Sequence, residues 1–183
     1  MKNLKLGLLS VLLCSSLFAG DYVVDSSHSN VGFSVKHMMV SNVVGKFNDF
    51  SGTFVYDEKS NSLVSLKGEL KVASIDTSNS KRDGHLKGDD FFDSKKYPNI
   101  TFKTTKVQKN RVFGDITIKG VTKNIELKLE NGGAFALKSG FSLSGLIKRS
   151  DFGITWNKVL EAGAVAVGDD VKLIIDIEGD LVK

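Results

Sequence analysis

The sequence predicts an all-β protein folded as one antiparallel sandwich or barrel. Three observations carry this prediction. Apolar and polar residues alternate with a period of two along most of the chain, short polar turns separate the alternating segments, and the 183 residues include 18 Gly but one Pro. Such alternation is typical of strands with one buried and one solvated face. About eight strands closed on themselves leave an interior that fills with side chains or holds one small ligand.

Each strand is predicted from a segment in which every second residue is apolar. In the sixth, for example, Ile125, Leu127 and Leu129 alternate with charged residues. The predicted strands are, in order, residues 31–37, 45–56, 64–73, 100–107, 112–118, 125–130, 135–149 and 171–178. Polar turns are predicted at residues 58–62, 109–110, 131–133 and 168–170.

One long segment, residues 75–97, lacks this alternation. It is too polar and too often interrupted by Gly for a long buried helix, so a short helix followed by a loop is predicted. Within it, Arg82, Asp83 and His85 precede the adjacent Phe91 and Phe92. We expect this segment to cap the mouth of a barrel that holds an apolar ligand.

The first 19 residues are predicted to be a cleaved signal peptide, which leaves a single domain over residues 20–183. Lys2 and Lys5 precede a short apolar run, and Ala19 is a small residue at the expected cleavage point. Because that run is too short to span a bilayer, we expect a soluble protein exported to the periplasm, without stable membrane insertion. Cys14 is the only cysteine, so the cleaved protein has no thiol for disulfides, catalysis or metal binding.

The charge pattern argues against nucleic acid as a partner. Without Lys2 and Lys5 the basic count falls from 25 to 23 against 21 acidic residues, a net charge of +2, and the charges are interspersed. The three His are scattered along the chain, and no Gly-x-Ser-x-Gly motif is present. We therefore expect no metal, no cofactor other than a bound ligand, and no catalytic residues.

Five motifs in order resemble the YceI-like family of lipid- or polyisoprenoid-binding periplasmic proteins. They lie at residues 25–37, 45–52, 82–92, 114–123 and 148–153, and the resemblance covers about residues 22–181. The resemblance implies a lipocalin-like, eight-stranded antiparallel β-barrel with a short helical segment near one end. It also implies a hydrophobic tunnel for an isoprenoid or other long-chain amphiphile, and a role in transport or stress response.

The candidate ligand-binding residues lie on predicted inward faces or near the predicted rim. The inward set is Phe33, Val35, His37, Phe47, Phe54, Phe102, Phe141, Leu143, Ile147 and Arg149. The rim set is Arg82, His85, Phe91, Phe92, Phe152 and Trp156. For the apolar members, ordinary core packing and tunnel lining are both open.

The polar candidates have structural alternatives. His37 is either a hydrogen-bonded core residue or a partner for a lipid head group. Arg149 forms a structural salt bridge to Asp83 or Asp151, or it recognises a diphosphate or carboxylate head group. Asp83 is expected to serve as a helix cap or turn residue, with His85 packed on the cap, rather than in acid–base chemistry.

The sequence thus favours a non-enzymatic carrier that sequesters a long-chain amphiphile. Two alternatives stay open: an enzyme that modifies a lipid or quinone in the same cavity, and a stress-protective binder that acts through its surface. A homodimer is compatible with the sequence, but no feature requires one.

Overall fold

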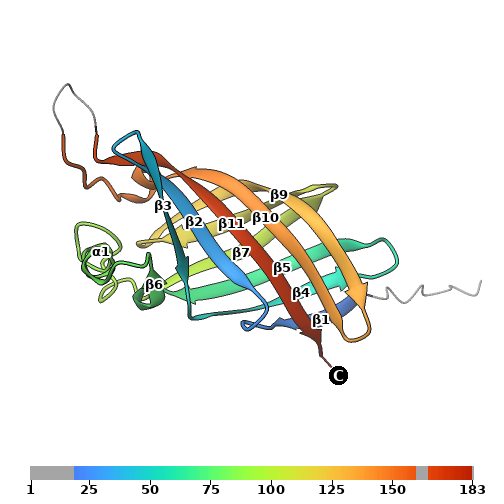
Figure 1. Ribbon diagram of the computed structural model, residues 1–183. Helices are drawn as coiled ribbons and strands as arrows, with labels where there is room; N and C mark the ends of the chain where they lie inside the picture. The colour runs from blue at the N-terminus through green and yellow to red at the C-terminus, as the bar shows by residue number, and fades with distance from the viewer. Residues whose placement is uncertain (1–18, 160–164, 183) are drawn as a thin grey trace, which may run out of the picture.

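The computed structural model, which describes residues 19–159 and 165–182, is a closed antiparallel β-barrel with one short helix (Figure 1). The strands are β1 (Ala19–Val24), β2 (Asn30–His37), β3 (Ser41–Phe47), β4 (Phe50–Asp57), β5 (Ser62–Lys71), β6 (Ile75–Asp76), β7 (Asn99–Gln108), β8 (Arg111–Ile118), β9 (Val121–Phe135), β10 (Lys138–Lys148) and β11 (Val167–Leu181). The helix α1 covers Ser80–Leu86, and two 3-10 turns, η1 and η2, cover Val72–Ser74 and Arg149–Phe152. The predicted signal peptide up to residue 18 lies outside the described residues.

Eight strands close the barrel, in the order β1-β4-β5-β7-β8-β9-β10-β11, with β11 pairing back to β1. The long strand β11 makes this closure possible because its edge opposite β10 pairs with two strands. Its residues 167–176 pair with β2, and its residues 179–181 pair with β1. The β2–β3 hairpin and the short β6 therefore extend the wall at one end only.

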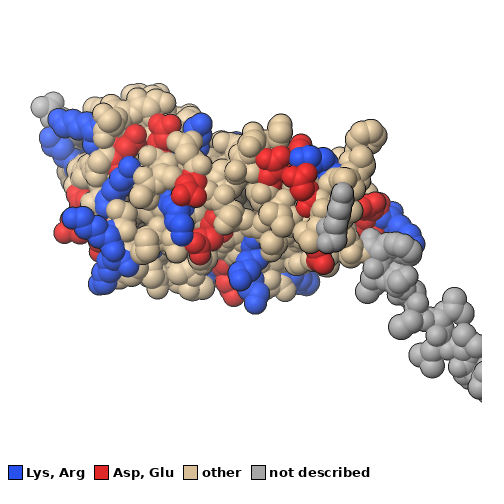
Figure 2. Space-filling view, turned by 90° about the horizontal axis from the view of Figure 1, so that it is seen from below, with Lys and Arg blue, Asp and Glu red and all other residues tan. Residues whose placement is uncertain are grey.

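The two ends of the barrel differ (Figure 1). At one end, called here the helix end, lie α1, β6 and the turn between β2 and β3. At the opposite end, called the far end, lie β1, the β9–β10 turn and the C-terminus. In the face that Figure 2 shows, basic and acidic side chains are interspersed along the length of the molecule. Within the described part of the chain, no helix is long and apolar enough to cross a membrane.

The interior contains two hydrophobic clusters, one toward each end. The far-end cluster includes Tyr22 and Phe54, which are 0% and 2% exposed. The helix-end cluster includes Phe91, Ile116 and Phe152, all buried. Phe102 packs against both clusters and so marks the boundary between them.

Four details of the sequence prediction were wrong. The strand predicted over residues 135–149 crosses a turn, since residue 135 ends β9 and β10 begins at residue 138. The strand predicted over residues 45–56 is two strands, β3 and β4. The turn predicted at residues 131–133 lies inside β9, where Gly140 pairs with Gly133 but Phe141 pairs with Asn131, so Gly132 is the extra residue of a bulge. The turn predicted at residues 168–170 lies inside β11, at another register shift. In both cases glycine and polar residues mark a bulge rather than a reversal of the chain.

The strand β1 was missing from the prediction. Its six residues carry only a short apolar pattern, and one edge pairs with β4 while the other pairs with the last residues of β11. The helix and loop expected within residues 75–97 are confirmed as α1 and the turns that follow it.

Candidate functional site

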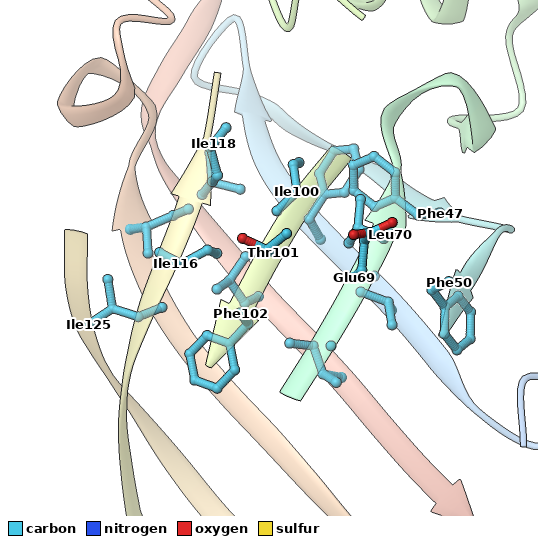
Figure 3. Close-up of a pocket in the computed structure, with 18 of the residues that line it drawn as sticks. Phe47, Phe50, Glu69, Leu70, Ile100, Thr101, Phe102, Ile116, Ile118 and Ile125 are labelled. Carbon is cyan, nitrogen blue, oxygen red and sulfur yellow. The ribbon is translucent and has the colours of Figure 1, made fainter. Parts of the chain in front are cut away.

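The barrel contains a cavity of about 200 Å³ that lies mainly in its helix-end half and reaches Leu66, Leu127, Leu143 and Ile177 of the far-end cluster. Residues of every described strand except β6 line it, together with residues of α1, of the loop after it and of η2. In Figure 3, Ile116, Ile118 and Ile125 line one side, Ile100 and Phe102 project from β7, and Leu70 lies on the other side with Phe47. The wall is therefore built mainly from branched aliphatic and aromatic side chains.

The strand pattern explains this wall. On each strand every second side chain points inward, so Ile100 and Phe102 on β7, and Ile116 and Ile118 on β8, face the same space. Their outward neighbours are polar and solvated. Among the described residues, every buried side-chain nitrogen or oxygen has a hydrogen-bond partner. The cavity thus presents apolar surface without an unpaired polar group of the wall, which suits an apolar tail.

Ten of the sixteen predicted ligand-binding residues lie in the cavity wall. They are Phe33, Val35, Phe47, Phe91, Phe92, Phe102, Leu143, Ile147, Arg149 and Phe152. The other six do not line it. They are His37, Phe54, Arg82, His85, Phe141 and Trp156.

Phe54 and Phe141 face inward as expected, but they lie in the far-end cluster. The Phe54 ring stacks on Tyr22 at 5.0 Å between centroids and meets Phe141 edge-on at 5.1 Å. Phe54 and Phe141 are 2% and 3% exposed. Alternation predicts the face on which a side chain lies but not its position along the barrel axis, so these two rings fill the core instead of lining the cavity.

His85 and Trp156 lie outside the cavity and pack against Phe91 of its wall. The His85 ring lies 4.9 Å from the rings of both Phe91 and Trp156, and Phe91 lies 5.2 Å from Trp156. The Nε2 atom of His85 is 2.6 Å from an Asp90 carboxylate oxygen. This cluster fixes Phe91, which itself lines the cavity. His37 ends β2, opposite Ser41 and Val167, and lies outside the wall.

Arg149 makes no ion pair with Asp83 or Asp151, so the predicted salt bridge was wrong. Its side chain is nearly buried, and it donates hydrogen bonds to four main-chain carbonyl groups, those of Ile154, Trp156, Val167 and Gly168, at 2.8 to 3.3 Å. Burial lowers the pKa of the guanidinium, and the charge of Asp169 opposes that shift. Arg149 thus ties η2 and the segment after it to the start of β11. A contact to a ligand head group stays a prediction.

Arg82 and Asp83 hold the helix in place through Thr77. Arg82 donates from Nε to the Thr77 hydroxyl and from an Nη2 atom to the Thr77 carbonyl, at 2.8 and 2.7 Å. The Asp83 carboxylate accepts from the Thr77 amide and hydroxyl. The helix N-cap is Asn79, which accepts from the Arg82 amide. The expectation that Asp83 caps the helix is therefore wrong, because Asn79 is the cap. Asp83 instead connects the helix to Thr77.

Sequence reasoning missed several residues of the wall. Phe50, Ile100, Ile116 and Ile118 line the cavity and lie on predicted strands, so the alternation itself could have found them. The wall also includes a pair of facing glycines, Gly52 and Gly68. No residue pattern signals that pair, because only the register of β4 against β5 brings it together.

One cluster of possible metal ligands lies at the far end. Atoms of Asp25, His28 and Glu178 lie within 4.8 Å of one another. The Lys138 ammonium group already contacts this cluster, at 2.9 Å from Asp25 and 3.3 Å from Glu178. Hydrogen bonds from His28 and Lys138 lower the pKa of Asp25, and the bond to Asp25 raises the pKa of His28. The cluster is explained as an ion-pair network.

The chain resembles known proteins over most of its length. The YceI-like domain model matches residues 22–179. A UPF0312 protein of Staphylococcus aureus strain N315 is 37% identical over 158 residues, which cover 83% of this chain and 92% of that protein. The solved YCEI protein of Campylobacter jejuni is 39% identical, with a TM-score of 0.69 over 87% of this chain and 96% of that one. A polyisoprenoid binding domain from Saccharophagus degradans shares the fold alone, at 16% identity and a TM-score of 0.69 over 88% of this chain and 98% of that domain.

Proposed function

This chain belongs to the YceI-like family, and on that premise we propose that it is a non-enzymatic binding protein that sequesters an isoprenoid or other long-chain amphiphile in the barrel. The observation that carries the proposal is the cavity of about 200 Å³ with apolar walls in the helix-end half. The polyisoprenoid binding of the Saccharophagus degradans domain supports it as an analogy between proteins of one fold.

The driving force is the removal of apolar surface from water. Each methylene buried contributes about 0.8 kcal/mol, so about ten buried carbons supply about 8 kcal/mol before the cost of ordering the ligand is subtracted. Dense polar recognition is unnecessary for such a ligand, because shape and apolar contact provide most of the affinity. The polar head group would lie at the helix end, where solvent is close.

The helix end supplies the cover over the ligand. Leu86 of α1 and Phe91 and Phe92 of the following loop line the cavity. Phe92 meets Phe47 edge-on at 6.2 Å between centroids, which joins the loop to the barrel wall at β3. Because α1 has no buried residue of its own, its displacement breaks less packing than that of a barrel strand, and the buried Phe91 of the loop is the main contact that opening must break. We expect ligand entry beneath it.

We propose that the protein acts in the periplasm, to which the predicted signal peptide would deliver it. The charged groups near the cavity have structural partners: Arg149 binds carbonyl groups, and His85 binds Asp90. This arrangement supports holding a ligand over modifying it.

The test is to purify the exported protein from its native cell, confirm that it is folded, and analyse an organic-solvent extract by mass spectrometry. We expect one abundant isoprenoid or long-chain species in near-stoichiometric amount. An empty extract from folded protein that also takes up no added amphiphile would contradict the proposal and favour a function of the outer surface. A chemically altered product that accumulates when ligand is added would favour the enzyme alternative.

A further inference from the structure

Gly68 leaves space at the deep end of the cavity. It occupies the inward position on β5 between Leu66 and Leu70, and its register partners are Gly52 on β4 and Phe102 on β7. A Cβ atom at Gly68 would meet one atom within 4 Å, the main-chain oxygen of Ser51 at 3.7 Å. That is ordinary van der Waals contact. A larger side chain at this position would therefore fit the backbone and project into the cavity.

At three other inward glycines of the barrel, an aromatic ring occupies the space that a Cβ atom would need. A Cβ at Gly114 would lie 2.2 Å from the Phe102 ring, and one at Gly45 would lie 2.4 Å from the Phe33 ring. At Gly179 the Phe54 ring lies 2.5 Å away. The Phe102 ring thus packs on Gly114 of β8 and leaves the neighbouring Gly68 open. Among the described strand glycines without a left-handed φ, Gly68 is the one whose Cβ would have no neighbour within 3.4 Å.

The filled half of the barrel begins directly beyond Gly68. Leu66 is the next inward residue on β5, and its register partner on β4 is Phe54. They are 8% and 2% exposed and belong to the far-end cluster. In Figure 3, Phe102 is the labelled β7 residue furthest along the strand from the helix end. The Gly52–Gly68 pair therefore lies at the floor of the cavity, which it forms together with Leu66, Leu127, Leu143 and Ile177 of the far-end cluster.

We propose that Gly68 sets the length of the apolar tail that this protein accepts, and this inference rests on the proposed binding function. A tail that enters from the helix end reaches the Gly52–Gly68 pair with its last carbons, because Leu66 and Phe54 close the space beyond. Affinity should rise with each added methylene, by up to about fourfold per carbon, until the tail reaches this floor. Further carbons stay in solvent at the helix end and add nothing.

The experiment measures dissociation constants for straight-chain fatty acids and alcohols of increasing length, from about eight to about eighteen carbons, below their micelle concentrations. It compares the wild-type protein with Gly68→Ala and Gly68→Leu. The matched control is Lys67→Leu, which adds the same side chain to the adjacent outward position of β5. Circular dichroism and thermal unfolding establish that each variant is folded.

The wild-type affinity is expected to rise with length and then level off. In Gly68→Leu the plateau should begin about three to four carbons earlier, because four side-chain carbons occupy the deep end of a close-packed interior. Gly68→Ala should shift it by about one carbon, and Lys67→Leu should not shift it. A second variant with the opposite sign is Leu66→Ala, which deepens the cavity and should move the plateau to longer chains.

The outcomes separate this inference from the proposed function. If the wild-type protein binds these chains and all the folded variants share one plateau, Gly68 does not set tail length, although the binding function stands. If the folded wild-type protein binds none of the chains, the binding function itself is contradicted. Should Gly68→Leu fail to fold, Gly68→Ala and Leu66→Ala still decide the matter, since they predict shifts of opposite direction.

Discussion

At the scale of single residues, Arg149 is an inward-facing charged side chain whose hydrogen bonds hold the fold together. It follows the inward Ile147 in sequence, and in the structure its donors meet four carbonyl groups. Removing these donors would leave one buried and three partly buried carbonyl oxygens without these partners, which is costly. The segment after η2 forms part of the cavity wall through Ile154, so the fold of the wall depends on this side chain.

We predict that Arg149→Lys lowers the free energy of unfolding by about 2 to 4 kcal/mol, since a lysine cannot reach four carbonyl groups. The matched control is Arg111→Lys, at an exposed pair with Glu126, which should change it by less than about 0.5 kcal/mol. Denaturant unfolding measures both. Equal stability of the two variants, with ligand affinity lost only in Arg149→Lys, would show a head-group role instead.

Residue-scale reasoning from the sequence placed ten of its sixteen candidates in the cavity wall but did not find the limits of the cavity. Phe33 and Phe141 both alternate correctly on inward faces, yet Phe33 lines the cavity and Phe141 packs in the filled half. The difference is their position along the barrel axis, which depends on strand register and on the bulge at Gly132. Register is a property of paired strands, so a pattern read along one strand could not supply it.

At the scale of elements, Thr77 connects α1 to the barrel by hydrogen bonds, beside the packing of His85 on Trp156. Its hydroxyl accepts from Arg82 and donates to Asp83, and its carbonyl also accepts from Arg82. Thr77 is 3% exposed and directly follows β6. The helix is thereby connected to the barrel edge formed by β3 and β6.

We predict that Thr77→Val loosens α1 and speeds ligand release several-fold, while unfolding free energy falls by about 1 to 2 kcal/mol. Hydrogen exchange of the α1 amides and stopped-flow displacement of a bound fatty acid measure the two effects. Thr117→Val removes the hydroxyl of an exposed pair with Thr122 and serves as the control. Unchanged exchange in α1 of Thr77→Val would contradict this role.

The far end contains a second such connection, the network of Asp25, His28, Lys138, Glu178 and Asp180. It joins the β1–β2 turn to β10 and β11. The pKa of His28 is raised above 6.5, so the folded state holds this proton more tightly than the unfolded chain. Its stabilising effect is present below pH 6.5 and is lost as pH rises through the folded pKa. The lowered pKa of Asp25 stabilises above pH 3.8 and is lost as pH falls through the folded value.

We therefore predict that the melting temperature of the wild-type protein exceeds that of His28→Asn by more at about pH 5.5 than at about pH 8.5. The His28 side chain is 65% exposed, so salt screens its pairing with Asp25 and the difference should shrink at high ionic strength. Differential scanning calorimetry at the two pH values tests this. A difference between the proteins that does not depend on pH would mean that His28 does not titrate in this network.

At the scale of the whole molecule, the barrel divides into a filled half and a hollow half. The far-end cluster supplies dense packing around Tyr22, whose pKa is raised to about 12 by burial and by its hydrogen bond to Glu58. The helix-end half is packed less densely because it contains the cavity. The strands and the helix were predicted from the residue pattern and the closed barrel from the family resemblance, but this division was not predicted, because alternation is the same in both halves.

This division predicts that core mutations in the two halves differ in their effects on unfolding free energy and on ligand binding. Leu129→Ala in the filled half should lower the free energy of unfolding by about 2 to 5 kcal/mol, without changing which tail lengths bind. Ile116→Ala at the cavity wall should cost less, because its neighbours already border empty space, and should change ligand affinity. Chemical unfolding and ligand titration of both variants check this. Loss of tail-length preference in folded Leu129→Ala would contradict the division.

The central claim is that the hollow half receives an apolar tail, and nuclear magnetic resonance tests it most directly. A fatty acid with a labelled terminal methyl group is added to protein with labelled isoleucine and valine methyl groups. We predict intermolecular Overhauser effects from the terminal methyl to the cavity residues Ile100, Ile116 and Ile125. Effects confined to surface methyl groups such as that of Val40, or none at saturating ligand, would contradict the claim.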